Sequence, residues 1–296
     1  MRSEMIKYKD FPENLRNIPK PPKQLYILGN KQILNETSIA IIGSRVCTPE
    51  GEKIAKQFAS KLSKKGICII SGMAKGIDTS AHLGALKAGG KTIAVLGGGF
   101  NHIYPEENKN LFWSIIENGG AVISEYRENT KPSSAHFIQR NRIVSGLSMG
   151  VLIIEAKHRS GTAITANFAR IQGRKIFCIP HSLEQKEGIG TNRQIKNGAK
   201  LVTTPEEIIA ELKIKTETIK KEKNEIEIIE VPEEYLPVYK YISNQPINID
   251  EICKKTKLEI SKVNCILTML ELEGYIQQLP GKNFVKNDDL EVRGER

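Results

Sequence analysis

Glycine-bearing loops with basic residues are the part of this sequence best suited to bind an anion. Four of them each follow a short apolar segment: Gly43-Ser44-Arg45, Ser71-Gly72-Met73-Ala74-Lys75-Gly76-Ile77-Asp78, Gly97-Gly98-Gly99 and Ser160-Gly161-Thr162. Small residues let a ligand approach the backbone, and free N–H groups at the start of a following helix favour anions. With Arg45 and Lys75 among them, the loops predict an anion-binding face. Tight turns without a ligand are the alternative.

A second segment combines cations with an aromatic ring. It contains Phe137, Arg140, Asn141 and Arg142. The apolar pattern predicts a helix from Phe137 to Leu147, which places both arginines near its start, where the helix dipole disfavours cations. We therefore expect either an external anion or a carboxylate, Glu125 or Glu155, beside them. Phe137 could stack on a base, as aromatic residues do in single-strand binders, or it could pack in the core.

Catalytic and cofactor motifs are not recognisable. The histidines lack metal-ligand spacing, and Asp78 and His82, four apart on a helix, are more typical of a structural hydrogen bond than of catalysis. Residues 85–92 fit a loose phosphate-loop pattern, but a helix precedes the loop and a strand follows it, which is the reverse of a phosphate-binding loop. The dinucleotide fingerprint is incomplete at Gly97-Gly98-Gly99. We expect no metal, no cofactor and no catalytic group.

Charge and cysteine usage restrict the partners and the compartment. The 296 residues contain 44 Lys+Arg and 34 Asp+Glu, a formal net charge of +10. This surplus favours a polyanionic partner, although an unspecialised basic protein is an equal alternative. No apolar segment is long enough to cross a membrane and no signal peptide is visible. The five cysteines are scattered, which favours a reducing cytoplasm.

The apolar pattern predicts a Rossmann-like, doubly wound, mostly parallel α/β sheet over residues 37–212. Six short apolar segments indicate strands, at Ser38–Ile42, Ile67–Ile70, Thr92–Leu96, Ala121–Ser124, Gly150–Glu155 and Lys175–Ile179. Helical patterns separate them, at Pro49–Lys65, Asp78–Ala88, Glu106–Asn118, Phe137–Leu147 and Thr162–Gln172. Alternation of strand and helix is typical of this fold. A last unit, Gly198–Val202 and Pro205–Leu212, closes the domain.

The flanking segments have other patterns. Residues 1–36 are rich in polar residues and proline, and we expect an extended lead-in there. Residues 213–230 alternate charged and apolar residues and predict a charged linker or an exposed helix. Residues 231–296 predict three short helices and a hairpin, the pattern of a small winged-helix domain. The last two helices, Ile249–Thr256 and Ser261–Gly274, have helix-turn-helix spacing. The recognition helix would be Ser261–Gly274, which has few basic residues for reading duplex DNA.

Taken together, the motifs resemble those of the DprA/Smf family of DNA-processing proteins. The resemblance rests on the Gly43 and Ser71 loops, Ala81-His82, Tyr104-Pro105-Glu106-Glu107-Asn108, Phe137 with Arg140-Asn141-Arg142, Glu155, and Ser160-Gly161-Thr162-Ala163-Ile164-Thr165-Ala166. They occur in the family's order and spacing from about Phe11 to Leu212. The C-terminal segment is similar to the winged helix that many members carry.

The resemblance implies that the chain binds single-stranded DNA and delivers it to the RecA recombinase during natural transformation, as a homodimer. It places a DNA pocket on Gly43, Ser44, Arg45, Ser71, Gly72, Lys75, Gly76, Phe137, Arg140, Asn141, Arg142, Ser160, Gly161 and Thr162. Two features depart from the family. Many members begin with a helical SAM-like domain, where we expect only the lead-in over Phe11–Asn30, and Pro180-His181 stands where Pro-Gly is common.

Two other functions compete with this one. Lysine-decarboxylase-like phosphoribohydrolases share the expected architecture and would make the chain a nucleotide-binding enzyme or sensor. Their catalytic glutamate would fall at Ala166, so we expect the chain not to be an enzyme. The other possibility is a regulator that binds DNA mainly through its winged helix.

Overall fold

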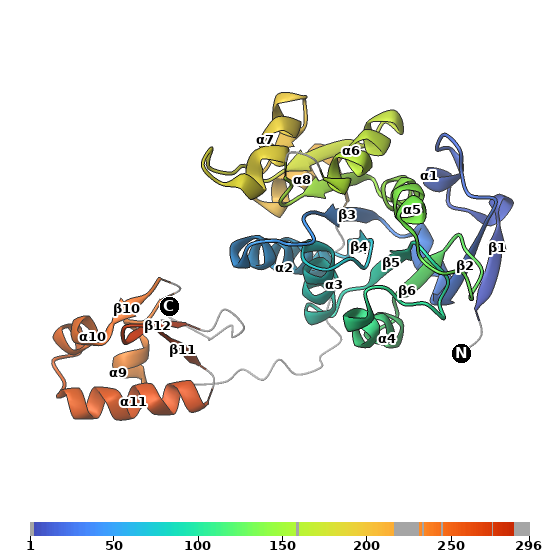
Figure 1. The fold of residues 1–296 in the computed structure, drawn as a ribbon. Helices are drawn as coiled ribbons and strands as arrows, with labels where there is room; N and C mark the ends of the chain where they lie inside the picture. Colours follow the sequence, from blue (N-terminus) through green and yellow to red (C-terminus); the bar gives the residue numbers. More distant parts are fainter. Residues whose placement is uncertain are drawn as a thin grey trace. The chain divides into compact units, whose positions relative to one another are not determined.

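The computed structural model describes residues 3–157, 160–215, 231–232, 234–243, 245–273 and 275–286. It divides into two compact units, Met1–Ile219 and Lys220–Arg296, which we describe separately (Figure 1). The linker expected over residues 213–230 lies outside the described residues from 216 onward.

The described part of the first unit is built on a nine-stranded sheet. Its strands are β1 (Glu4–Lys7), β2 (Gln24–Gly29), β3 (Ser38–Ile42), β4 (Cys68–Ser71), β5 (Thr92–Leu96), β6 (Ala121–Ser124), β7 (Gly150–Ile153), β8 (Lys175–Cys178) and β9 (Lys200–Leu201). They follow the order β1-β2-β6-β5-β4-β3-β7-β8-β9. The β1–β2 and β2–β6 pairs are antiparallel and the others are parallel, which confirms the predicted mostly parallel α/β class.

Strand order reverses at the β3–β7 pair. From β3 the chain proceeds through β4, β5 and β6 to one side, and then returns to add β7, β8 and β9 on the other. The loops that leave β3 and β7 therefore diverge at the carboxyl edge of the sheet. Such a switch point is where open α/β sheets bind ligands.

The N-terminal segment differs from the expected lead-in, because β1 and β2 extend the sheet beyond β6. Leu25 and Ile27 of β2 are fully or almost fully buried, and they pack with Ile6 and Leu15 in one core cluster. The alternation of Leu25 and Ile27 is a strand signal that follows the proline-rich stretch. The lead-in is thus an integral part of the first unit.

Helices cover both faces of the sheet (Figure 1). They are α1 (Glu13–Arg16), α2 (Pro49–Lys64), α3 (Ile77–Lys87), α4 (Lys109–Glu117), α5 (Ser134–Leu147), α6 (Gly161–Ile171), α7 (Ile189–Lys196) and α8 (Pro205–Leu212). One core cluster receives side chains from α1, α5 and α6, and another from α2 and α3. Six helices, α2 to α6 and α8, lie within a few residues of their predicted positions. The short α1 and the polar α7, which contains Gly190, were not predicted.

The second unit has the predicted elements of a winged helix. Its elements are α9 (Leu236–Tyr239), β10 (Ile247–Asn248), α10 (Ile249–Thr256), α11 (Ile260–Leu272), β11 (Ile276–Leu279) and β12 (Asn283–Lys286). The strands form a small sheet in the order β10-β12-β11. Val263, Ile266, Leu267 and Leu270 of α11 are buried in its core, as the apolar stripe predicts. The short strand β10 was not predicted.

Candidate nucleic-acid interface

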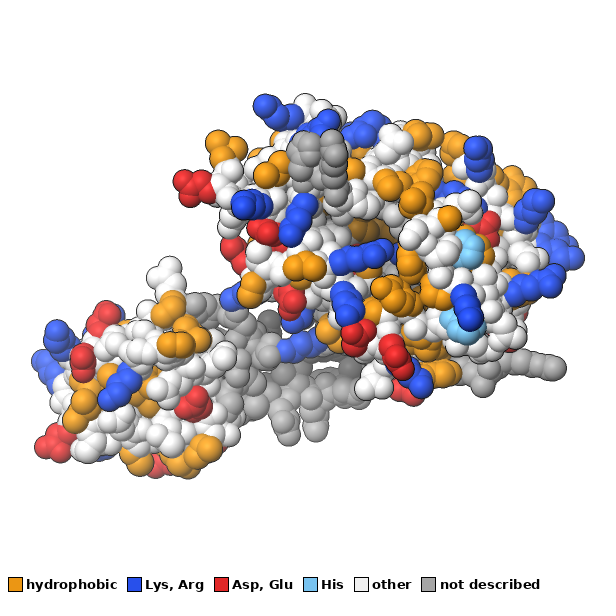
Figure 2. Space-filling model, in the orientation of Figure 1, with side chains coloured by type: hydrophobic (Ala, Val, Ile, Leu, Met, Phe, Trp, Pro, Cys, Tyr) orange, Lys and Arg blue, Asp and Glu red, His pale blue; other side chains and the backbone are white. Residues whose placement is uncertain are grey.

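A cavity of about 630 Å³ opens at the carboxyl ends of β3 and β7. The sequence-predicted residues that line it are Gly43, Ser44, Arg45, Gly72, Phe137, Arg140, Asn141, Ser160, Gly161 and Thr162. On the visible face of the first unit, basic and hydrophobic side chains lie side by side around a hollow (Figure 2). Segments from four separate parts of the sequence thus meet at the switch point.

Close packing of two glycine loops shapes the cavity floor. Gly76 has φ +75°, and a Cβ there would lie 2.4 Å from the Ser44 carbonyl oxygen. The Ile77 N–H donates to that same oxygen over 3.2 Å. A Cβ at Gly43 would collide with the Ile77 side chain. These glycines therefore allow the Gly43 and Ser71 loops to touch. Gly76 permits this close backbone contact and does not line the cavity.

An aromatic ring beside a cation forms the side wall. The guanidinium carbon of Arg45 lies 5.3 Å from the Phe137 ring centroid. The Tyr104 ring is tilted against Phe137, with 5.4 Å between centroids, and is 52% exposed. Phe137 itself is half-buried and lines the cavity. Phe137 is not among the buried core residues of the first unit, so the alternative that it packs in the core does not hold.

Arg140 is a buried cation at the bottom of the cavity. Only 4% of the residue is exposed, and its Nη1 donates to the carbonyl oxygens of Gly72 and Val95. Burial lowers the pKa of its guanidinium to about 10, with Asp78 opposing the effect. Because α5 begins at Ser134, Arg140 lies beyond the first turn. The expected conflict with the helix dipole, an effect confined to that turn, therefore does not arise.

Asp78 links Arg140 to the Ser71 loop. Its Oδ2 accepts from the N–H groups of Gly72 over 3.0 Å and Ala74 over 3.3 Å. Burial raises the pKa of this carboxyl, and the Arg140 charge and the hydrogen bonds oppose the rise. Asp78 thus fixes the loop and balances a buried charge. It does not bond His82, whose Nδ1 lies 2.7 Å from the Thr92 hydroxyl.

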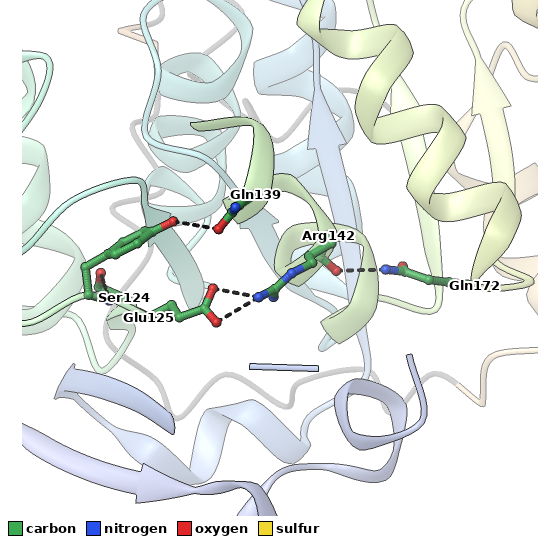
Figure 3. A network of polar contacts seen from close by, with 6 residues as sticks. Ser124, Glu125, Gln139, Arg142 and Gln172 are labelled. Carbon is green, nitrogen blue, oxygen red and sulfur yellow. Dashed lines mark hydrogen bonds and ion pairs between the residues drawn. The ribbon is translucent and has the colours of Figure 1, made fainter. Parts of the chain in front are cut away.

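Arg142 lies outside the cavity lining, contrary to the prediction. Its Nη2 donates to both carboxylate oxygens of Glu125 over 2.7 Å, and the side chain is 12% exposed. Gln172 Nε2 donates to the Arg142 carbonyl oxygen over 2.9 Å (Figure 3). The alternative that a carboxylate neutralises an arginine of this segment is therefore correct for Arg142, with Glu125 as the partner.

Ser71 and Lys75 also lie outside the lining. The Ser71 hydroxyl is buried and donates to the Ile41 carbonyl oxygen over 2.6 Å. Lys75 projects into solvent and pairs with Glu107 over 2.5 Å, which raises the pKa of the lysine. The neighbouring residue Ala74 lines the cavity, so Lys75 lies close to it, but the charge of Lys75 is already paired with that of Glu107.

The glycine triplet after β5 supports other segments and does not line the cavity. A Cβ at Gly97 would lie 2.5 Å from the Phe137 ring, and one at Gly99 would lie 2.1 Å from the Arg127 carbonyl oxygen. A Cβ at Gly98 would lie 3.0 Å from the Pro132 nitrogen, a tighter contact than most side chains make. Phe137 and the segment that precedes α5 therefore pack directly against the backbone of the triplet.

Glu155 holds the start of α2. Its carboxylate accepts from the Thr48 N–H over 3.1 Å and from the Thr48 hydroxyl, and 1% of the residue is exposed. Thr48 is the N-cap of α2. On α6, Ala166 is fully buried at the position where the phosphoribohydrolases would carry glutamate. Neither position offers a carboxylate to the cavity.

Some lining residues were not predicted. They are Ile42, Val46, Ala74, Asp78, Tyr104, Ser134, Ile138, Val144, Lys157, Ile164 and Thr165. Tyr104 and Lys157 matter most, because they add a ring and a cation. Tyr104 belongs to a motif that the sequence does contain, Tyr104-Pro105-Glu106-Glu107-Asn108, whereas no local signal distinguishes Lys157.

Among the described residues, no group of three or more His, Cys, Asp or Glu side chains is placed to hold a metal ion. Within the same ranges, no helix is long and apolar enough to span a membrane.

Comparison with known proteins relates both units of the chain to the same family. Residues 3–213 match the family described as DNA recombination-mediator protein A, and residues 228–282 match the DprA winged helix domain. The chain is 35% identical to Protein Smf of Escherichia coli over 275 residues, which is 92% of this chain and 74% of that protein.

Two solved structures are similar to this chain over about seven tenths of its length. The DNA processing protein A of Streptococcus pneumoniae is 40% identical with a TM-score of 0.67, over 71% of this chain and 75% of that one. The protein of Helicobacter pylori, described for its single-stranded DNA binding mode, is 30% identical with a TM-score of 0.65, over 72% of this chain and 96% of that one. The chain belongs to the DNA recombination-mediator protein A family, that of the DNA processing proteins DprA and Smf.

Proposed function

We propose that this chain binds single-stranded DNA in the cavity between the Gly43 loop and α5. The observation that carries the proposal is the contact of Arg45 with the Phe137 ring at the wall of an open cavity. Proteins that bind single strands combine cations for the backbone with aromatic rings for the bases, and this wall offers both. The Helicobacter pylori relative, which binds single-stranded DNA, supports the assignment.

Single strands fit this site better than duplex DNA. Phe137 lines the cavity half-buried, with the exposed Tyr104 ring beside it, and a base stacks on Phe137 only after it separates from its neighbours. Arg45 at the lining supplies charge for phosphates, and Lys157 adds a second cation that lies 3.7 Å from the Glu187 carboxylate. Arg140 is held by backbone carbonyls below them. We expect Arg140 to act on DNA through its charge and through the loop it supports.

We further propose that the bound strand is delivered to the RecA recombinase and that the chain works as a homodimer in the cytoplasm. The family's description as a recombination mediator supports the delivery step. A non-catalytic role agrees with Glu155, which is fully engaged by Thr48, and with Ala166, which replaces the phosphoribohydrolase carboxylate. Turnover of AMP-like nucleotides that Glu155→Gln abolishes would contradict the non-catalytic role.

Fluorescence anisotropy with the full chain tests the binding proposal. We expect a labelled poly-dT strand to bind more tightly than a duplex of equal length. Its affinity should fall steeply between 50 and 200 mM salt, the range over which counterion release weakens such complexes by orders of magnitude. Equal affinity for the two DNA forms would contradict it. RecA filament formation on the bound strand, measured with and without the chain, tests delivery.

A further inference from the structure

We propose that the DNA strand leaves the cavity across residues 127–132, here called the basic loop, where Arg127 and Lys131 bind its phosphates. The inference rests on the proposed function and adds the path that the strand takes once it leaves the cavity. The basic loop joins β6 to α5, so it leads directly into the helix that carries Phe137.

The basic loop adjoins the rim of the cavity. Lys131 precedes Ser134, a lining residue, by three positions, so their Cα atoms are at most about 10 Å apart. The loop also rests on the strand-end glycines: Pro132 packs on Gly98, next to the contact of Phe137 with Gly97. A strand with one base on Phe137 therefore has Lys131 within reach of an adjacent phosphate.

Within the described part of the chain, the two cations of the basic loop have no carboxylate partner, in contrast to Lys75 and Lys157. Arg127 and Lys131 are exposed, and within the described ranges neither side chain pairs with a carboxylate. Lys75, by comparison, pairs with Glu107. The basic loop contains one acid, Glu128, whose carboxylate accepts from the Ser3 hydroxyl. Unpaired cations release counterions when a phosphate binds, and thus favour a polyanion.

Hydrogen bonds hold the basic loop in one shape. The Gly99 N–H donates to the Thr130 carbonyl oxygen over 2.8 Å, and the Asn101 N–H donates to that of Glu128 over 3.0 Å. Within the loop, the Thr130 N–H donates to the Arg127 carbonyl oxygen over 2.9 Å. A fixed backbone carries the two cations without a large ordering cost on binding.

Both ends of the basic loop are attached to α5. At its start, Glu125 pairs with Arg142 (Figure 3), and the Tyr126 ring stacks on His136 with 4.1 Å between centroids. At its end, Ser133 caps α5 by accepting from the His136 N–H. The cations are therefore fixed relative to Phe137, as a continuous path for one strand requires.

DNA length separates this inference from the proposed function. The experiment compares two poly-dT strands, four and twenty nucleotides long. Anisotropy measures the binding of the labelled long strand directly and that of the short strand by competition. Both strands are tested on the unmodified chain and on the double variant Arg127→Ala with Lys131→Ala. We expect the double variant to bind the long strand about tenfold more weakly. Its salt slope should be flatter by about 1.4, the contribution of two phosphates on a single strand. Affinity for the short strand should fall by much less than affinity for the long strand, because a strand that fills the cavity reaches the basic loop only at one end.

The matched control is Lys61→Ala with Lys65→Ala, which removes equal charge from the far end of α2. Lys61 lies about 18 Å along the helix from its start beside the cavity, at 1.5 Å per residue. This control should bind both strands as the unmodified chain does. Arg127→Gln with Lys131→Gln replaces the alanine pair if that pair fails to fold.

Three results would overturn the inference: an unchanged affinity of the double variant for the long strand, an equal loss on both strands, or an equal loss in the control. Failure of the unmodified chain to bind either strand would instead overturn the proposed function.

Discussion

The guanidinium group of Arg45 lies over the Phe137 ring, with 5.3 Å between the guanidinium carbon and the ring centroid. A cation and a ring in this arrangement contact a phosphate and its base together. We predict that Phe137→Leu weakens poly-dT binding by about 1–3 kcal/mol, the usual loss of one stacked base. Arg45→Ala should flatten the salt slope by about 0.7, the contribution of one phosphate. Anisotropy at two salt concentrations measures both effects, and unchanged affinity in both variants would place the site elsewhere.

Lys75 gives a contrasting prediction, because its charge is already paired with Glu107. If Lys75 contacts DNA, Glu107→Gln should strengthen poly-dT binding by freeing the lysine. Lys75→Ala should then abolish that gain in the double variant. Binding that responds to neither substitution would remove Lys75 from the site.

Gly97 should control the position of Phe137. The Cβ of Gly97→Ala would lie 2.5 Å from the Phe137 ring, so the ring has to move and poly-dT binding should weaken. Gly161→Ala is the comparison variant: its Cβ would also face the cavity but would meet nothing within 4 Å, so it measures the effect of an added Cβ without a displaced ring. Thermal unfolding checks that both variants fold. Normal DNA binding by folded Gly97→Ala would show that the ring's position is unimportant.

His82 should make the stability of the first unit depend on pH. Its Nδ1 donates to the Thr92 hydroxyl, which itself donates to the Ile69 carbonyl oxygen, and its buried Nε2 has no partner within the described part of the chain. Burial lowers the pKa of His82 from 6.5 to about 3. Between these values the unfolded chain binds a proton that the folded chain does not.

Stability from His82 is therefore complete above about pH 6.5 and falls as the pH drops toward 3, by about 1.4 kcal/mol per pH unit. His82→Gln cannot titrate, so its unfolding free energy should lack this part of the slope. Urea unfolding of both proteins at pH 5, 6 and 7 measures the difference. Parallel curves would contradict the assignment of a neutral, buried His82.

Much of this architecture is predictable because short apolar segments between turn residues mark buried parallel strands. Ser38–Ile42, Thr92–Leu96 and Ala121–Ser124 are strands with the predicted bounds. The N-terminal strands were missed because prolines dominate that segment and because the pairing of β2 with β6 is a long-range contact. No local pattern reveals such a contact.

The site was harder to predict than the fold. Motifs indicated the loops that line the cavity, but sequence alone does not show which side chains turn inward. Arg140 and Arg142 are two residues apart on α5 and point to different partners, backbone carbonyls for Arg140 and Glu125 for Arg142. The error about the helix dipole arose because α5 begins at Ser134, three residues before the predicted start.

The winged helix should contribute little to single-strand affinity. The outward positions of α11 include Glu259, at its N-cap, Asn264, Thr268 and Glu271, and Leu272 is 76% exposed. A duplex-reading helix would carry more cations to contact phosphates. We predict that a chain ending at residue 215 keeps poly-dT affinity within about tenfold, or 1.4 kcal/mol, of the full chain. A larger loss, with the first unit still folded, would make the winged helix a principal DNA site.

Photo-crosslinking of a bound strand tests most directly whether DNA occupies the cavity. A poly-dT strand with a single 5-iodouracil is irradiated on the full chain, and the attached residue is identified by mass spectrometry. We predict attachment at Phe137 or Tyr104, the rings at the cavity, and not at Trp113, which is 40% exposed on α4. Arg45→Ala should reduce the yield. Crosslinks confined to Trp113 or to residues 231–286 would contradict the account.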